Sequence, residues 1–335
     1  MDERFLRSRM LLGEAAMEHL RASHVAVFGL GGVGSWCAEA LCRSGVGELT
    51  LVDRDRVSES NRNRQLCALG STVGRPKAEV MAERLLDISP DCRVHPILGH
   101  YAAADRDRFF ADYDYVVDCI DLVSCKLDLI LSCRERGIPI VSALGTGNKK
   151  DASLLRLDDI ANTFGCALAR VVRKELRARG VEHHPVVFSP EEPMTPEQLE
   201  APDPGRRSVP GSLVWVPATA GLLLCQKVVL DLAERPPLPS PLTGKSKPPL
   251  PAAEEGGLLL PQRSKKPRIS ASPKVFSGTA RRTGGIRRSP ARRMKDEVSL
   301  RRLNGEPSLR LGTSSTASGP PSPCGGRQIT PRPAP

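Results

Sequence analysis

Short apolar runs alternate with amphipathic segments along the first 145 residues. The apolar runs predict β-strands, which we expect at 24–28, 48–52, 93–98, 115–120 and 139–143. The amphipathic segments repeat apolar positions every three to four residues and predict helices, which we expect at 13–20, 35–43, 77–88 and 124–136. Strands that alternate with helices are typical of a doubly wound, mostly parallel α/β sheet of Rossmann-like architecture.

A second block, residues 146–235, continues this pattern less regularly. Its expected elements are a helix at 168–179, a long mobile loop at 181–211, a strand at 213–216 and a helix at 219–232. We therefore predict a Rossmann-like domain in residues 1–145, with a C-terminal α/β extension that belongs to the same unit.

The last 100 residues differ in composition from the rest of the chain. Residues 236–335 hold 18 of the 30 prolines and carry 19 Lys and Arg against 5 Asp and Glu. Residues 1–235 carry 30 Lys and Arg against 33 Asp and Glu, so the formal net charge of +11 comes from the tail. The tail has too few apolar residues to offset its chain entropy by burial. We predict a disordered tail outside the functional fold, with RNA binding through its arginine pairs as the alternative.

Cysteine usage and hydropathy indicate a reducing compartment and no membrane. Ten cysteines occur without any C-x-x-C pair, and several, such as Cys119 and Cys225, lie in apolar runs, which favours buried, reduced thiols. The first nine residues are rich in charge, so we expect no signal peptide. Lys227 and Asp231 interrupt the apolar segment 213–233 and make it a poor membrane span. We expect a soluble, cytoplasmic protein.

A glycine-rich turn follows the first predicted strand. The sequence GLGGVG places Gly29, Gly31, Gly32 and Gly34 between that strand and a helix. Glycines permit a tight turn and let phosphates approach the backbone at the positive N-terminus of the helix. Asp53 ends the next strand, where a carboxylate can bind a ribose hydroxyl. This pattern predicts a nucleotide site, but it does not separate a nicotinamide dehydrogenase from an ATP-using enzyme.

Polar residues beyond Asp53 favour ATP. Those able to fold back over the nucleotide are Asn61, Arg64, Gln65 and Lys77. Asp118 and Asp121, in the sequence DCID at the end of another strand, can supply a magnesium ligand, because the carboxyl ends of parallel strands meet at one edge. Attack on an ATP phosphorus needs cations and a metal ion around the developing charge, whereas hydride transfer needs no such clamp.

Four stretches together resemble one superfamily. The stretches are GLGGVGSW, LVDRDRVSESNRNRQ, TVGRPKAEVMAERL and DCID. They are similar to the ubiquitin-activating-enzyme-like adenylyltransferases of the ThiF/MoeB/HesA superfamily. The resemblance covers about residues 4–233. It implies ATP-dependent adenylation of a carboxylate with Mg²⁺, formation of an acyl-AMP and release of pyrophosphate. Residues 1–145 would then be the ATP-binding adenylation domain, and 146–235 would complete the same catalytic unit.

The resemblance also implies roles for single residues. Asp53 would bind the ribose, and Asp121 would bind magnesium. The residues that would hold the phosphates are Asn61, Arg64, Gln65 and Lys77. Arg7, in RFLR, matches the arginine that reaches the neighbouring subunit's ATP site in this superfamily. That match implies a homodimer with composite active sites, in which Arg7 is catalytic together with Arg64, Lys77 and Asp121.

Later stretches are similar to one branch of the superfamily. They resemble the tRNA threonylcarbamoyladenosine dehydratase branch. The stretches are SALGTGNKKD, CALARVVRKELRARGV, VVFSPEEP and GSLVWVPATAGLLLCQKVVLDL. That branch implies adenylation of the threonylcarbamoyl carboxylate on adenosine 37 of tRNA, followed by closure into a cyclic, dehydrated form. No covalent cysteine intermediate is needed, because the nucleophile is on the same substrate, and we expect Cys166 to be a core or helix-start residue. The two zinc-binding C-x-x-C pairs of sulfur-carrier activators are missing, so no zinc is expected.

A tRNA substrate must find local positive charge on a folded part whose net charge is −3. One face of the 168–179 helix provides it, with Arg170, Arg173, Lys174 and Arg177. A solvated helix face is the alternative interpretation. The opposite face is apolar and is expected in the core, with Leu168, Val171, Val172 and Leu176. His183 and His184 stand alone in the predicted loop, and we expect both at the surface.

Three other functions remain open. The first is adenylation of a sulfur-carrier or ubiquitin-like protein, which requires a partner ending in Gly-Gly and would make a sulfur-transfer protein a second candidate partner. The second is a nicotinamide-dependent oxidoreductase, which leaves Arg64, Lys77 and Asp121 without a common purpose. The third is a catalytically inactive binding module, which the presence of all the expected polar residues disfavours.

Overall fold

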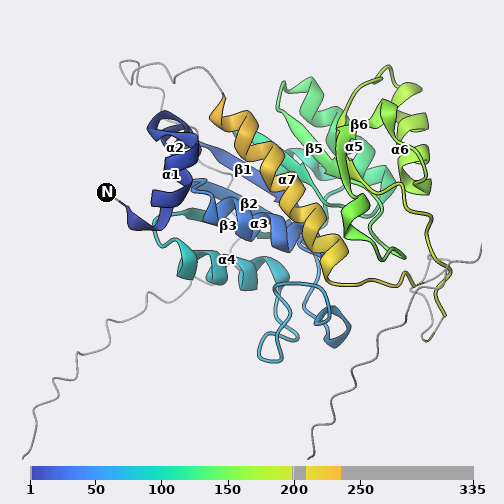
Figure 1. The fold of residues 1–335 in the computed structure, drawn as a ribbon, viewed down its shortest axis with the longest axis horizontal. Helices are drawn as coiled ribbons and strands as arrows, with labels where there is room; N and C mark the ends of the chain where they lie inside the picture. Colours follow the sequence, from blue (N-terminus) through green and yellow to red (C-terminus); the bar gives the residue numbers. More distant parts are fainter. Residues whose placement is uncertain (1, 198, 200–208, 235–335) are drawn as a thin grey trace, which may run out of the picture. The chain divides into compact units, whose positions relative to one another are not determined.

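The seven strands in the described part of the chain form one sheet in the order β3-β2-β1-β4-β5-β7-β6 (Figure 1). The computed structural model describes residues 2–197, 199 and 209–234. The strands are β1 (His24–Phe28), β2 (Glu48–Asp53), β3 (Arg93–Leu98), β4 (Tyr115–Asp118), β5 (Ile140–Ala143), β6 (Arg156–Asp159) and β7 (Pro185–Phe188). All pairs are parallel except β6 with β7. The predicted doubly wound, mostly parallel α/β sheet is confirmed, with the reversal of strand order between β1 and β4.

The sheet separates two hydrophobic cores. One core holds side chains of α2 (Glu14–Ala22), α3 (Gly34–Arg43), α4 (Lys77–Ile88) and α7 (Trp215–Ala233). The other holds side chains of η3 (Ala103–Phe109), α5 (Val123–Glu135) and α6 (Ala167–Arg177). Strand residues alternate between them: Val25 and Val27 of β1 join the first core, while Ala26 and Phe28 join the second. This alternation with period two fixes which side chains of each strand share a face.

Helix α7 crosses one face of the sheet beside α3 (Figure 1). It is long and apolar enough to span a membrane by length and composition, with a mean hydropathy of 1.4, but half of that window is buried within the protein. Its fully buried positions, which recur every four residues, are Val216, Ala220, Leu224, Val228 and Leu232. That burial is the pattern of a helix in a protein core.

Several expected elements differ from the structure in the second block. Residues 213–216 are not a strand, because α7 already begins at Trp215, with Pro217 in its first turn, where a missing N–H costs nothing. The 181–211 segment is not a loop throughout, since β7 lies within it, between β5 and β6. β6 was missed, because its sequence RLDD has no apolar alternation.

Strands β6 and β7 extend the same sheet that residues 1–145 begin. The predicted disordered tail, 236–335, lies outside the described residues.

Candidate nucleotide site

The glycine turn joins β1 to α3 at the switch in strand order. Gly29 has a φ of +91° and donates its N–H to Val52 O at 2.8 Å. A Cβ on Gly29 would lie 2.6 Å from Cys119 O, and one on Gly34 would lie 1.8 Å from Gly29 O. Only glycine fits at these two positions, so the turn stays tight and the N-terminus of α3 opens toward the carboxyl edge of the sheet, where the strands end.

The other two glycines of the turn face the polar stretch that follows β2. A Cβ on Gly31 would lie 3.9 Å from Gln65 Nε2, and one on Gly32 would lie 3.6 Å from Arg64 Cγ. Gln65 is buried, whereas Arg64 is partly exposed. Trp36, in the first turn of α3, donates its indole N–H to Arg64 O at 3.1 Å. The structure therefore brings Arg64 and Gln65 to the glycine turn, as the sequence predicts.

Asp53 connects the end of β2 to the same turn. Its Oδ2 accepts the N–H of Leu30 at 2.6 Å, and its Oδ1 accepts the N–H of Asp55 at 2.7 Å. Burial raises the pKa of Asp53, although Lys77 and the two backbone hydrogen bonds oppose that rise. Each carboxylate oxygen has a second lone pair, so the carboxylate can still accept a ribose hydroxyl.

The remaining predicted phosphate ligands lie between the end of β2 and the start of α4 and have local partners. Lys77 is buried at the start of α4, and its Nζ lies 3.0 Å from Asp55 Oδ2. Asn61 is buried, and its Oδ1 accepts the N–H of Ser58 at 3.2 Å. Arg64 Nη1 donates to Ser60 O at 2.8 Å. Asn61 thus shapes the 58–61 turn, while Lys77 and Arg64 supply positive charge in the segment after β2.

The two aspartates at the end of β4 have different environments. Asp118 is fully buried and lies 2.6 Å from Lys126 Nζ, which also donates to Ala143 O at 3.0 Å. This buried ion pair ties β4 to α5 and β5, so the expectation that Asp118 can ligate a metal ion is wrong. Asp121 is exposed just before α5 and makes no hydrogen bond or ion pair with the rest of the described chain.

Residues 210–217, which lead into α7 and form its first turn, contact the site on two sides. Ser212 O accepts the side-chain N–H of Asn63 at 3.0 Å, next to Arg64. Trp215 Nε1 donates to Lys150 O at 2.7 Å, in the loop after β5. Pro217 Cβ would lie 3.1 Å from a Cβ on Gly32. The C-terminal block therefore completes the surroundings of the glycine turn.

Sequence reasoning missed Lys149 in the loop after β5. Its side chain is buried, and Nζ donates to Ser189 O at 2.5 Å. Burial lowers the pKa of Lys149, opposed by Cys166 and Glu191. Lys149 lies six residues after the end of β5, and only the glycine-rich stretch between them could have indicated it. Cys166 is buried and accepts the N–H of Ala169 at the start of α6, as expected.

His184 is not at the surface, contrary to the expectation. It is buried, and its Nε2 lies 2.8 Å from Ser142 Oγ of β5. Burial, together with the charges of Lys126 and Arg134, lowers the pKa of His184 to about 3. The residue stays neutral and belongs to the core, whereas the side chain of His183 is 77% exposed.

The basic face of α6 is less uniform than the sequence suggests. Arg170, Lys174 and Arg177 are exposed, but Arg173 donates to Thr163 O at 2.5 Å and also to the hydroxyl of Thr163. Arg173 thus fastens the turn that precedes α6. Val171, expected in the core, is 44% exposed. Three side chains therefore remain as outward-facing candidates for phosphate contact.

Arg7 lies on α1 (Leu6–Leu12) and is exposed. Its neighbours in the chain pack at the amino edge of the sheet, where the strands begin: Arg4 pairs with Asp91 before β3 at 2.5 Å, and Phe5 contacts Gly45 before β2. The structure therefore does not bring Arg7 to the glycine turn of its own chain.

Comparison with known proteins adds a family to this geometry. The ThiF family is matched over residues 5–244. A tRNA threonylcarbamoyladenosine dehydratase of Bacillus subtilis is 40% identical over 243 residues, covering 69% of this chain and 95% of that protein. One from Escherichia coli is 42% identical over 178 residues, covering 52% of this chain and 66% of that protein, just under two thirds.

A solved structure is similar over the same part of the chain. It is the E. coli tRNA N6-threonylcarbamoyladenosine dehydratase TcdA in complex with ATP, with a TM-score of 0.62 and 36% identity. The match covers 69% of this chain and 93% of that one.

Proposed function

Because the chain belongs to the ThiF family, we propose that it is an ATP-dependent enzyme that dehydrates threonylcarbamoyladenosine at position 37 of tRNA. The observation that carries this proposal is the composition of the carboxyl edge. A tight glycine turn, a ribose-binding carboxylate and two cationic side chains, Arg64 and Lys77, meet there at the switch in strand order. Such an edge is where open α/β sheets bind nucleotides, and a relative bound to ATP shares the fold.

The reaction has two steps on one substrate. In the first, a carboxylate oxygen of the threonylcarbamoyl group attacks the α-phosphorus of ATP, and pyrophosphate leaves with the electrons of the broken P–O bond. In the second, an atom of the carbamoyl group attacks the activated carbonyl carbon, AMP leaves with the electrons of the broken C–O bond, and the carbamoyl group loses an N–H proton. The net change in the nucleoside is the loss of one water, and no enzyme nucleophile takes part.

The residues of the carboxyl edge fit the first step. Asp53 binds the ribose, and the N-terminus of α3 with Gly29, Gly31, Gly32 and Gly34 accommodates the phosphates. Arg64 and Lys77 stabilise the negative charge that builds on the attacked phosphate. Asn61 and Gln65 orient the turn that holds Arg64, and Gln65 is placed beside Gly31.

Magnesium fits one position at this edge. Mg²⁺ binds proteins through one or two carboxylates and takes its other ligands from phosphates and water. Asp121 offers an exposed carboxylate, whereas Asp118 is committed to Lys126. Asp121 would hold the ion, which, when bound, offsets phosphate charge during the displacement.

We include a homodimer in the proposal, with Arg7 reaching the partner's ATP. Arg7 lies on the amino-edge side of its own chain, so it can serve a nucleotide only in another subunit. Met10 and Leu11 on the same helix are 73% and 88% exposed, which favours a partner surface over α1. Mixing Arg7→Ala chains with Arg64→Ala chains should restore activity to about a quarter of wild type, since half of the dimers then hold one intact site. No restoration would contradict the shared site.

The tRNA contacts in this proposal are Arg170, Lys174 and Arg177 of α6, with Arg173 supporting the helix.

A cytoplasmic location fits the same function, since the nine cysteines of the described residues are free thiols.

The test uses the full chain with ATP, Mg²⁺ and tRNA that carries threonylcarbamoyladenosine. The tRNA is then digested and its nucleosides are weighed. Loss of one water from the modified nucleoside supports the proposal. ATP turnover that requires a protein ending in Gly-Gly, with the nucleoside unchanged, would support the sulfur-carrier function instead and would contradict ours.

A further inference from the structure

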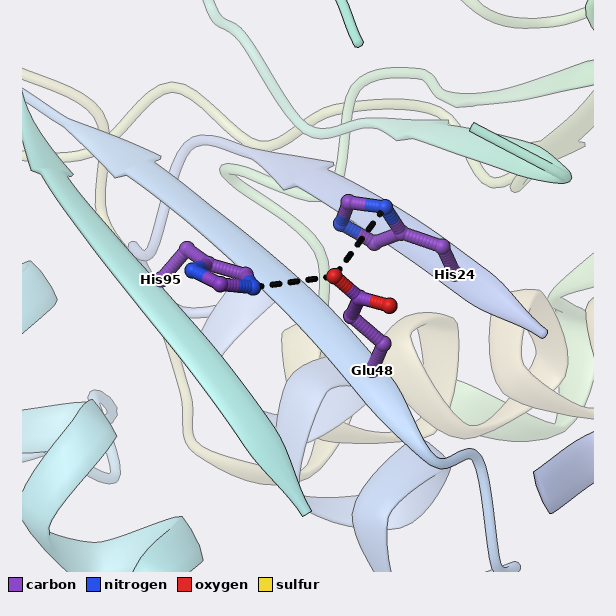
Figure 2. A group of neighbouring side chains, drawn as sticks. All are labelled: His24, Glu48 and His95. Atoms are coloured by element: carbon purple, nitrogen blue, oxygen red, sulfur yellow. Dashed lines mark hydrogen bonds and ion pairs between the residues drawn. The ribbon is translucent and has the colours of Figure 1, made fainter. Parts of the chain in front are cut away.

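Three side chains with metal-binding atoms converge at the amino edge of the sheet (Figure 2). They are His24 of β1, Glu48 of β2 and His95 of β3. His24 and Glu48 are the first residues of their strands, so the cluster lies at the amino edge of the sheet. One ligand atom from each residue lies within 4.8 Å of the other two.

The register of the strands produces this cluster. His24 pairs with Glu48 across β1 and β2, and His95 pairs with Thr50, two residues further along β2. Side chains two apart in a strand point to the same face, so all three lie on one face of the sheet. Strands in the core hold them there, which is a more precise placement than a loop allows.

Both imidazoles approach the same carboxylate oxygen. His95 Nε2 lies 3.0 Å from Glu48 Oε1, and His24 Nδ1 lies 3.6 Å from it. Ligands about 2.1 Å from a tetrahedral zinc ion lie about 3.4 Å from one another. Small rotations of these side chains therefore suffice to surround one ion.

Two other polar atoms of the cluster, one on His24 and one on Glu48, already have partners. His24 Nε2 lies 2.8 Å from Thr50 Oγ1, and Glu48 Oε2 accepts from Arg93 Nη2 at 2.5 Å. Metal-binding histidines usually use their second ring nitrogen for such a hydrogen bond, which fixes the tautomer. When His24 donates from Nε2 to Thr50, its Nδ1 turns a lone pair toward Glu48 Oε1.

Burial and charge suit an ion as well. The side chains of His24, Glu48 and His95 are 4%, 12% and 33% exposed, so the cluster is deep at His24 and open to solvent at His95. Glu48 supplies a carboxylate, and carboxylates bind metals in their ionised form.

We propose that His24, Glu48 and His95 form a binding site for a divalent transition metal ion, with Zn²⁺ as the preferred ion and water as its fourth ligand. Two imidazoles and a carboxylate suit zinc, whereas Mg²⁺ and Ca²⁺ prefer oxygen alone. The ion would join three neighbouring strands at their start. The site is separate from the ATP edge and does not depend on the proposed reaction.

The test uses the full chain after removal of metals with a chelator. Calorimetric titration with Zn²⁺ should give one tight site per chain. His95→Gln should weaken that site by at least about tenfold, and His95 is exposed enough for the variant to fold. His183→Gln, a matched change at an exposed histidine, should bind Zn²⁺ like wild type.

Co²⁺ identifies the ligands by absorption. Nitrogen and oxygen ligands give visible bands alone, whereas cysteine thiolates add a near-ultraviolet charge-transfer band. We expect visible bands that disappear in His95→Gln and remain in Arg64→Ala. Equal Zn²⁺ affinity in wild type and His95→Gln, a thiolate band or no tight site would each overturn the proposal.

Discussion

The two edges of the sheet gather polar side chains in different ways. At the carboxyl edge, Asp53, Arg64 and Lys77 come from the end of a strand and the segments that follow it. At the amino edge, His24, Glu48 and His95 come from the strands themselves, and register alone brings them together. A site carried by loops keeps its spacing along the sequence and can be recognised as a motif. A site carried by strands depends on pairing between distant segments.

The largest expected effect concerns the ion pair under the carboxyl edge. Lys126→Met should lower the free energy of unfolding by about 3–5 kcal/mol, because it leaves Asp118 charged and fully buried. Lys227→Met is the matched control: Lys227 pairs with Asp231 in a bridge whose side chains are 31% and 32% exposed, so this change should cost about 1 kcal/mol or less. Denaturant unfolding measures both. Equal losses would show that Asp118 does not need its partner.

The next largest effect is on catalysis, and it distinguishes two arginines of the polar stretch after β2. Arg64→Ala should lower ATP–pyrophosphate exchange by at least about a hundredfold, if Arg64 stabilises the transition state. Arg62→Ala should leave the exchange rate close to wild type, since Arg62 pairs with the exposed Glu59. A near-normal rate in Arg64→Ala would remove this residue from the site.

Much of the carboxyl edge could be predicted from the sequence. Helix 77–88 and the strands 24–28 and 93–98 have the expected bounds. Strand 24–28 is buried throughout and helix 77–88 has one buried face, whereas 93–98 is an edge strand without a buried residue. The approach of Gln65 to Gly31 follows from the glycine turn and a short chain connection. The sequence could not predict that Asp118 is paired and therefore unavailable as a metal ligand. Its partner Lys126 lies a full helix turn into α5 and appears there as a polar residue among apolar ones.

The second block and the amino edge were harder to predict for physical reasons. β6 reads RLDD and has no apolar run, and the short apolar run PVVF of β7 lies at the start of a segment rich in Pro and Glu that is typical of a loop. His183 and His184 look alike in the sequence, and only the pairing of β5 with β7 reveals that His184 has a buried partner, Ser142. The His24, Glu48 and His95 cluster likewise requires the strand order, which no local pattern contains.

A smaller effect is on the pH dependence of folding stability, and it distinguishes the buried His184 from the exposed His183. The folded pKa of His184, about 3, lies below its unfolded value of about 6.5, so the unfolded chain binds a proton first as pH falls. Stability from this group is complete above about pH 6.5 and is lost toward pH 3, by up to about 1.4 kcal/mol per pH unit. His184→Gln should flatten that slope in denaturant unfolding across pH, and His183→Gln should not. An unchanged slope in His184→Gln would contradict a neutral, buried His184.

The smallest expected effect concerns tRNA. Lys174→Glu should weaken tRNA binding several-fold and reduce the salt slope by about one, as expected for a lost phosphate contact. Arg108→Glu reverses a similarly exposed charge on η3, away from α6, and should leave the affinity unchanged. Filter binding at several salt concentrations measures both variants. Equal affinities for Lys174→Glu and wild type would make the basic face of α6 a solvated surface.

The central claim is that the carboxyl edge transfers AMP to a substrate carboxylate. Labelling the threonylcarbamoyl carboxylate of tRNA with ¹⁸O tests it directly, because adenylation places one carboxylate oxygen on the α-phosphorus. After turnover by the full chain, mass spectrometry should find one ¹⁸O in AMP and none in pyrophosphate. Unlabelled AMP, or ADP with the label in inorganic phosphate, would contradict adenylation at this site.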